Sequence, residues 1–254
     1  MVNRERPPHY SVINVSRSDR RPLELLGVRN SSVLLTNCTV WVEGITDRRY
    51  VAHWLDLYQQ HLHGSMPADR AKFLIEDLQY SFVEYSGGNI THWSFLDEEG
   101  PDVERLCGNL FLIADEDNMK PGAEKGKRQE KLIKKLQEKF HLLPVREIEN
   151  LLTPDNLKSV LMANGELPDN LKTVVEQDAY AGKQLGKFIE STIIKNLALK
   201  RRIGSYAGDS GTVSDKVKFC ERAIESMKEF DALSPAAQDL TQKVFDFIQS
   251  AQHS

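Results

Sequence analysis

Cysteine is scarce in this chain. Three cysteines occur among 254 residues, Cys38, Cys107 and Cys220, and no two of them form a CxxC pair. Structural zinc sites and disulfide frameworks both need cysteines at close, regular spacing, so the sequence argues against both. A reducing, cytoplasmic setting fits this cysteine usage best.

Long apolar runs are missing as well. A membrane-spanning helix needs about 18 or more consecutive apolar residues, and no segment approaches that length. The polar start, Met1 to Pro8, does not resemble a signal peptide. We therefore expect a cytoplasmic protein with no membrane partner, whose length allows one large domain or two small ones.

Several familiar catalytic patterns are also absent. The chain has no HExxH motif and no GxSxG motif. Gly-Lys pairs occur within residues 122–128 and 182–188. Neither has the glycine spacing, the following Ser or Thr and the preceding strand that a phosphate-binding loop requires. The sequence therefore contains no recognisable ATPase.

The formal net charge of −4 hides two strongly basic segments. Residues 120–139 hold eight Lys and Arg against three Glu, and residues 195–202 hold four basic residues and no acid. Such segments are either solvated helix faces or surfaces that contact phosphate groups, and the sequence leaves both interpretations open.

Strand and helix signals alternate in the first part of the chain. The apolar runs predict strands at 38–43, 80–85 and 109–114, and a short extended segment at 142–147, where Pro144 disfavours a helix. Helical spacing predicts helices at 47–60, 89–98 and 127–140. This alternation is typical of βαβ units, so we expect an α/β, Rossmann-like fold with a mainly parallel sheet flanked by helices.

After Pro154 the pattern becomes helical. We predict helices at 155–164, 170–178, 181–199, 213–229 and 235–251, with a glycine-rich break at 204–211. The chain then divides into a leader at residues 1–36, an α/β domain at 37–155 and a helical C-terminal region at 156–254.

Acidic residues follow two of the predicted strands. Glu43 and Asp47 lie on either side of a glycine turn after the first strand, and Asp115 and Asp117 follow the strand at 109–114. Alternate residues of an extended chain point the same way, so Asp115 and Asp117 can share one hard cation. Open α/β sheets bind their ligands at the edge where the carboxyl ends of the parallel strands meet, which is where these acids are expected. Surface or helix-capping acids are the alternative interpretation.

A third acidic pair, Glu147 and Glu149, follows the extended segment that contains Pro144. An extended backbone would place both side chains on one side, whereas on a helix they would point about 200° apart, as in an ordinary charged helix start. The three pairs together carry more negative charge than one Mg²⁺ neutralises. Two cations about 4 Å apart would suit them, the arrangement used for in-line phosphodiester cleavage.

Three motifs occur in order: Val42-Glu43-Gly44-x-x-Asp47, Ala114-Asp115-x-Asp117 and Arg146-Glu147-x-Glu149-Asn150. Together they resemble the Toprim domain of the overcoming-lysogenisation-defect (OLD) family of ATPase-linked endonucleases, over roughly residues 24–155. Asp47 and the Glu-x-Glu motif are characteristic of this nuclease branch rather than of topoisomerases and primases. The resemblance implies a Toprim fold and a DNA endonuclease or nickase that uses two Mg²⁺ or Mn²⁺ ions, in anti-phage defence or DNA processing.

The resemblance also implies a role for each site residue. Two metal ions would be held by six carboxylates: Glu43, Asp115 and Asp117 for one ion, and Asp47, Glu147 and Glu149 for the other. A catalytic lysine is expected before a C-terminal helix, and Lys216 matches that position, with Lys218 as a close alternative. Such a lysine would offset charge on the scissile phosphate or position the attacking water. An ordinary solvated lysine is the remaining interpretation.

The partners implied by the resemblance are DNA and an ATPase. Residues 26–37 resemble the exit from an ATPase domain, so the ATPase would be a separate subunit or a missing domain, and a homo-oligomer is possible. Glu116 departs from the small or hydroxylated residue usual between the two aspartates, which implies an altered metal preference.

Two other functions compete with the nuclease. A haloacid-dehalogenase-like phosphatase would use Asp115 as its nucleophile, but would leave Glu43, Asp47 and the Glu-x-Glu motif without roles. A catalytically weak Toprim module would instead act as a partner-binding or sensing subunit.

Overall fold

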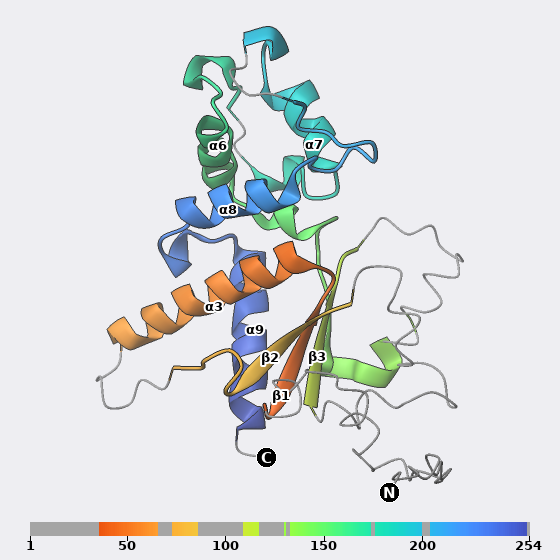
Figure 1. Ribbon diagram of the computed structural model, residues 1–254, viewed down its shortest axis with the longest axis vertical. Coiled ribbons are helices and arrows are strands. Elements are labelled where there is room, and N and C mark those ends of the chain that lie inside the picture. Colours follow the sequence, from red (N-terminus) through yellow and green to blue (C-terminus); the bar gives the residue numbers. More distant parts are fainter. Residues whose placement is uncertain are drawn as a thin grey trace, which may run out of the picture.

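The computed structural model describes residues 36–65, 73–85, 109–116, 130, 133–173, 176–199 and 204–252 (Figure 1). Several predictions therefore lie outside the described residues. They are Asp117, most of the leader at 1–36, the helix at 89–98 and most of the basic segment 120–139.

The described strands form one parallel sheet in the order β2-β1-β3-β4. The strands are β1 (Cys38–Val42), β2 (Tyr80–Glu84), β3 (Asn109–Ala114) and β4 (Phe140–Leu142). Cys38 is in register with both Tyr80 and Asn109, so β1, β2 and β3 begin level and their carboxyl ends meet at one edge. The predicted α/β class with a mainly parallel sheet is confirmed for this part of the chain.

The two central strands are buried on both faces, which explains their nearly continuous apolar sequences. Every residue of β1 is buried, as are the four inner residues of β3. Val40 and Phe111 are register partners on the face that joins the main core. On the opposite face, Trp41 donates a hydrogen bond from Nε1 to Thr39 Oγ1 (2.9 Å). A strand covered on both sides gains from apolar residues at every position.

Helix α3 (Ile45–Ser65) follows β1 after a turn at Gly44. Its apolar positions repeat at helical spacing, and Tyr50, Val51 and Trp54 are all buried. The helix begins two residues before the predicted start and continues beyond the predicted end at residue 60. Figure 1 shows α3 crossing next to α9, with α8 above it.

Helix α9 (Pro235–Ala251) covers one face of the sheet. Ser234 caps the helix, since its Oγ accepts a hydrogen bond from Ala237 N (3.3 Å), and Pro235 occupies the first helical position. The Phe247 ring lies 5.4 Å from that of Phe111 on β3. The last predicted helix, at 235–251, is thus confirmed, and it packs in the same layers as the α/β part.

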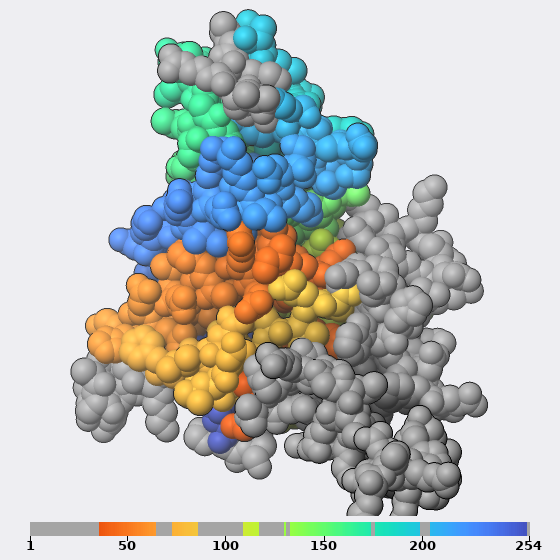
Figure 2. Space-filling view, in the orientation of Figure 1, coloured from red at the N-terminus to blue at the C-terminus, as the bar shows by residue number. Residues whose placement is uncertain are grey.

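Short helices fill the chain between β4 and α9. They are α6 (Pro154–Ala163), α7 (Leu185–Phe188) and α8 (Lys216–Ser226), with a 3-10 turn at Ile148–Leu151. In Figure 2, α8 (blue) lies between α3 (orange) and the helices farther up. No helix in the described ranges is long and apolar enough to cross a membrane.

Two helix predictions in this region are wrong. The segment predicted as a helix at 170–178 begins in a 3-10 turn, and Leu171 then forms an antiparallel bridge with Ile194, which requires extended backbone. The segment 181–199 breaks into α7, a π turn at Ile189–Ile193 and a 3-10 turn at Leu197–Leu199. The bridge needs extended backbone in both predicted helices, at Leu171 in the first and at Ile194 in the second, so neither helix is continuous.

The strand β4 overlaps the extended segment predicted at 142–147 only at Leu142, although Glu147, at the other end of that segment, also has extended backbone. The helix predicted at 127–140 ends in a 3-10 turn at Gln137–Lys139, where Gln137 has a φ of 50°. That left-handed backbone ends the helix and turns the chain into β4.

Candidate acidic site

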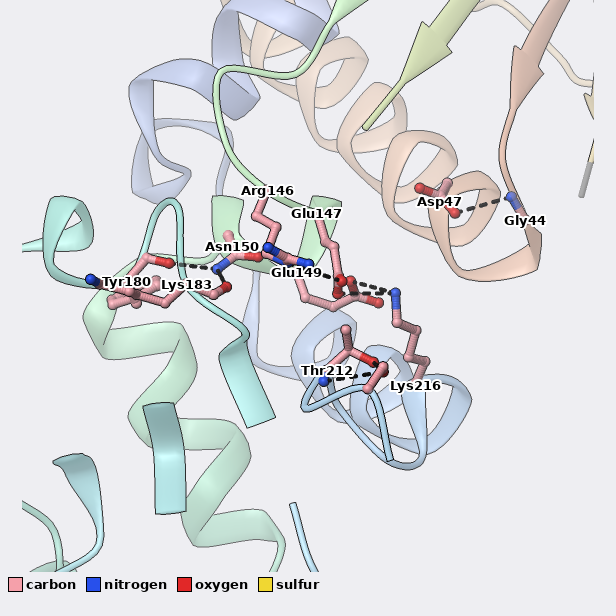
Figure 3. Close-up of polar contacts among 11 residues, drawn as sticks. Gly44, Asp47, Arg146, Glu147, Glu149, Asn150, Tyr180, Lys183, Thr212 and Lys216 are labelled. Carbon is pink, nitrogen blue, oxygen red and sulfur yellow. Dashed lines mark hydrogen bonds and ion pairs between the residues drawn. The ribbon is translucent and has the colours of Figure 1, made fainter. Parts of the chain in front are cut away.

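The turn after β1 holds Asp47 at the carboxyl edge of the sheet. The Gly44 backbone N–H donates a hydrogen bond to Asp47 Oδ2 (3.1 Å), as Figure 3 shows. Asp47 lies in the first turn of α3, where the helix dipole favours a negative charge. Glu43 precedes this turn, and Asp115 directly follows β3. Two strands thus bring acids to the same edge.

A second group joins Glu147, Glu149 and Lys216. Lys216 Nζ lies 3.2 Å from Glu147 Oε2 and 3.3 Å from Glu149 Oε2 (Figure 3). Glu147 has extended backbone, with φ −144° and ψ 160°, but Glu149 already belongs to the 3-10 turn at Ile148–Leu151. The two carboxylates therefore meet one cation, although the predicted extended backbone stops at Glu147.

Some acceptor capacity in this group is unsatisfied. Glu149 is fully buried, and its Oε1 has no hydrogen-bond partner among the described residues. Lys216 forms ion pairs with the other oxygen, Glu149 Oε2, and with Glu147 Oε2. A buried charged acceptor without a partner is costly, by about 1–3 kcal/mol or more. The described part of the chain therefore leaves acceptor capacity at Glu149 that another group can use.

The acids at the sheet edge repel one another. Burial raises the pKa of Asp47 to about 7, with further increases from Glu149 and Glu43, while Lys216 acts in the opposite direction. Burial likewise raises the pKa of Asp115 to about 9, assisted by Asp47, Glu43 and Glu149. Burial also raises the pKa of Glu149. Among the described residues, the acids of the cluster outnumber its two cations, Lys216 and Arg146.

Lys216 contacts both Glu147 and Glu149, and Arg146 adds a second positive charge, with its Nε 3.8 Å from Glu147 Oε1. Burial alone would lower the pKa of this ammonium group, but Glu149 and Glu147 outweigh burial and raise it. Lys218 is two residues further along α8, about 200° around the helix. It lines a separate cleft instead. Of the two lysines considered from the sequence, Lys216 is the one that contacts the acids.

Asn150 fixes the 3-10 turn that carries Glu149. Its Nδ2 donates hydrogen bonds to Tyr180 O (2.6 Å) and Lys183 O (3.2 Å), and its backbone oxygen accepts one from Gln177 Nε2 (2.6 Å). Asn150 ends the third motif, and the sequence predicted no role for it. The available signal was an amide directly after the Glu-x-Glu pair.

Helix α8 is attached to α3, which positions Lys216 relative to Asp47. Cys220 Sγ donates to Thr46 O (3.7 Å), and Arg49 forms an ion pair with Glu221 (2.8 Å). The first contact is buried and the second is exposed, so the buried contact fixes the helix more firmly.

The donor chemistry of the site fits a hard divalent cation such as Mg²⁺ or Mn²⁺. The donors are carboxylate oxygens with excess negative charge, and Glu149 Oε1 is buried without a partner. Within the described ranges, however, no three Asp, Glu, His or Cys side chains are grouped closely enough to hold a metal ion. The site therefore has the donor type and the charge that suit such a cation, but the described residues do not form a complete set of metal ligands.

Comparison of the chain with protein-family models, curated proteins and solved structures gives no match. The functional interpretation therefore depends on the three motifs and on the geometry around Lys216.

Proposed function

We propose that this protein is a metal-dependent DNA endonuclease or nickase with a Toprim-type catalytic domain. The observation that carries the proposal is the convergence of Glu147, Glu149 and Lys216 beside Asp47, above the carboxyl edge of a parallel sheet. Burial and mutual repulsion leave these acids in need of positive charge. The motif resemblance supports the reaction class.

Each acid has a proposed ligand role. One ion would be held by Glu43, Asp115 and Asp117, and the other by Asp47, Glu147 and Glu149. Such a pair of Mg²⁺ or Mn²⁺ ions supplies an activated water and stabilises the leaving oxygen of a phosphodiester.

The remaining groups of the site orient the acidic side chains or offset negative charge. The Gly44 amide orients the Asp47 carboxylate, and Asn150 holds the turn that carries Glu149. Lys216 keeps its proton at neutral pH and can offset negative charge on the scissile phosphate.

The proposed partner is an ATPase, as a separate subunit or a missing domain, that controls access to DNA in anti-phage defence or DNA processing. The absence of a phosphate-binding loop from the sequence supports a division of labour between this chain and an ATPase. The resemblance of residues 26–37 to an ATPase-domain exit agrees with it.

Plasmid nicking tests the nuclease. Supercoiled plasmid is incubated with Mg²⁺ or Mn²⁺ and wild-type protein, Glu149→Gln or Asp115→Asn, with the exposed Asp178→Asn as a matched control. We expect the wild type and the control to produce open circles, and each site variant to lose roughly 100-fold or more. Absence of cleavage by the wild type with either metal, alone or with an ATPase, contradicts the proposal.

A partner-binding module with little catalysis is the second candidate. Its support is that Lys216 compensates Glu147 and Glu149 without a metal, and that no complete ligand group is formed in the part of the chain that the structure describes. Titration calorimetry with Mn²⁺ separates the two functions. Binding that Glu149→Gln weakens favours the nuclease, and no heat of binding at millimolar Mn²⁺ favours the module.

A further inference from the structure

A cleft of about 560 Å³ opens beside α8, away from the acidic cluster. It is lined by Asn164 at the end of α6, by the loop at 204–214 and by α8 itself. Its volume lies within the range of about 300–1,000 Å³ that is usual for ligand pockets. The acidic site does not use this cleft.

The cleft carries positive charge. Lys218 and Arg222, one helical turn apart on α8, both line it. Neither side chain forms an ion pair with the described part of the chain. Asp215 also lines the cleft, but its Oδ1 accepts a hydrogen bond from the Lys218 backbone N–H (3.1 Å). Two cations and one carboxylate therefore line the cleft, which leaves it with a net positive charge.

The floor of the cleft is apolar and its rim is open. Tyr206, Val213 and Phe219 line it and are nearly fully buried. At Gly204, which has a φ of +92°, nothing lies within 4 Å of where a Cβ would be. An apolar floor lowers the local dielectric constant and strengthens the attraction of nearby cations for an anion.

We propose that this cleft binds backbone phosphates of the DNA strand on one side of the bond that is cleaved. This inference rests on the proposed function. Lys216 and Lys218 lie on different sides of the first turn of α8. A DNA strand that contacts Lys216 and continues past the start of the helix would therefore reach the cleft next. The acids repel a polyanion, and cations beside them supply affinity. Arg222 offers a planar donor pair suited to a phosphate group.

DNA binding by full-length variants tests the proposal. Lys218→Glu and Arg222→Glu are compared with Lys243→Glu, which makes the same charge change on α9, all in a Glu149→Gln background. Fluorescence anisotropy with a labelled oligonucleotide is measured at 50 and 200 mM salt. We expect each cleft variant to bind about 10-fold more weakly and its salt slope to fall by about one, while Lys243→Glu stays within about two-fold. Lys218→Gln and Arg222→Gln remove the positive charge without adding a negative one and so disturb the fold less. They should also weaken DNA binding, by less than the corresponding Glu variants.

The outcome is separable from that of the proposed function. Hydrolysis of bis(p-nitrophenyl) phosphate, which is too small to span to the cleft, should be unchanged in the cleft variants without the Glu149→Gln change, while plasmid nicking falls. Equal DNA affinity in the cleft variants and their Glu149→Gln parent overturns the cleft proposal, even if the wild type nicks plasmid. Conversely, weakened DNA binding by a protein that never cleaves supports the cleft and refutes the nuclease.

Discussion

Replacing Asp47 by asparagine should stabilise the metal-free protein at neutral and alkaline pH. The pKa of Asp47 is raised from 3.8 to about 7, first by burial and then by Glu149 and Glu43. Between these two values the folded protein binds a proton that the unfolded chain has released. The contribution of Asp47 to stability is therefore greatest below pH 4 and decreases as the pH rises towards 7. Asparagine has no proton to release and so acquires no buried charge in this range.

The expected gain in the free energy of unfolding follows from the difference between the two pKa values of Asp47. A difference between 3.8 and about 7 corresponds to roughly 4 kcal/mol at pH 8, at 1.36 kcal/mol for each pH unit. The shift already includes the attraction between Asp47 and Lys216, which acts to lower the pKa. The amide oxygen of asparagine can still accept the hydrogen bond from Gly44, so the turn is preserved.

Urea denaturation in EDTA at pH 4 and pH 8 measures the effect. The Asp47→Asn variant should match the wild type at pH 4 and exceed its free energy of unfolding at pH 8 by up to about 4 kcal/mol. The exposed Asp178→Asn is the control and should change little at either pH. If Asp47→Asn gains no stability between pH 4 and pH 8 relative to the wild type, the account of a charge-repelled site is wrong.

Three further predictions test the site and the helical region. Mn²⁺ should raise the melting temperature more at pH 8 than at pH 5, because ligand carboxylates must lose their protons to bind metal; an equal rise at both would contradict this. Lys216→Met should lower the melting temperature without metal and tighten Mn²⁺ binding in calorimetry, since a competing cation is gone; unchanged affinity would show that Lys216 does not compete. Gly186→Ala should lose about 1–3 kcal/mol in urea denaturation, because its Cβ would lie 2.4 Å from Thr212 O, whereas Gly182→Ala, with nothing within 4 Å, should be nearly neutral.

The sheet and the last helix were predictable because their signals are local. The strand predicted at 109–114 coincides with β3, and Ser234 with Pro235 marks the start of α9 as capping rules require. The acids at the sheet edge were also predictable, since parallel strands end together.

The wrong helices and the detail of the site depend on contacts between distant residues. No local sequence pattern predicts that Leu171 pairs with Ile194. The helical spacing on either side therefore predicted continuous helices that do not form. Whether Lys216 or Lys218 meets Glu149 depends on how α8 docks on α3, which spacing along the chain does not determine.

The position of α8 and α9 in the chain has a consequence for folding. The acids lie on elements from the first part of the chain, yet their cation and the cover over one sheet face arrive only with these two later helices. Closing such long loops is slow, so a chain in which the sheet has formed but α8 has not docked holds uncompensated acids beside an uncovered apolar face. Both are relieved only by residues 216–251, where α8 brings Lys216 to the acids and α9 covers the sheet.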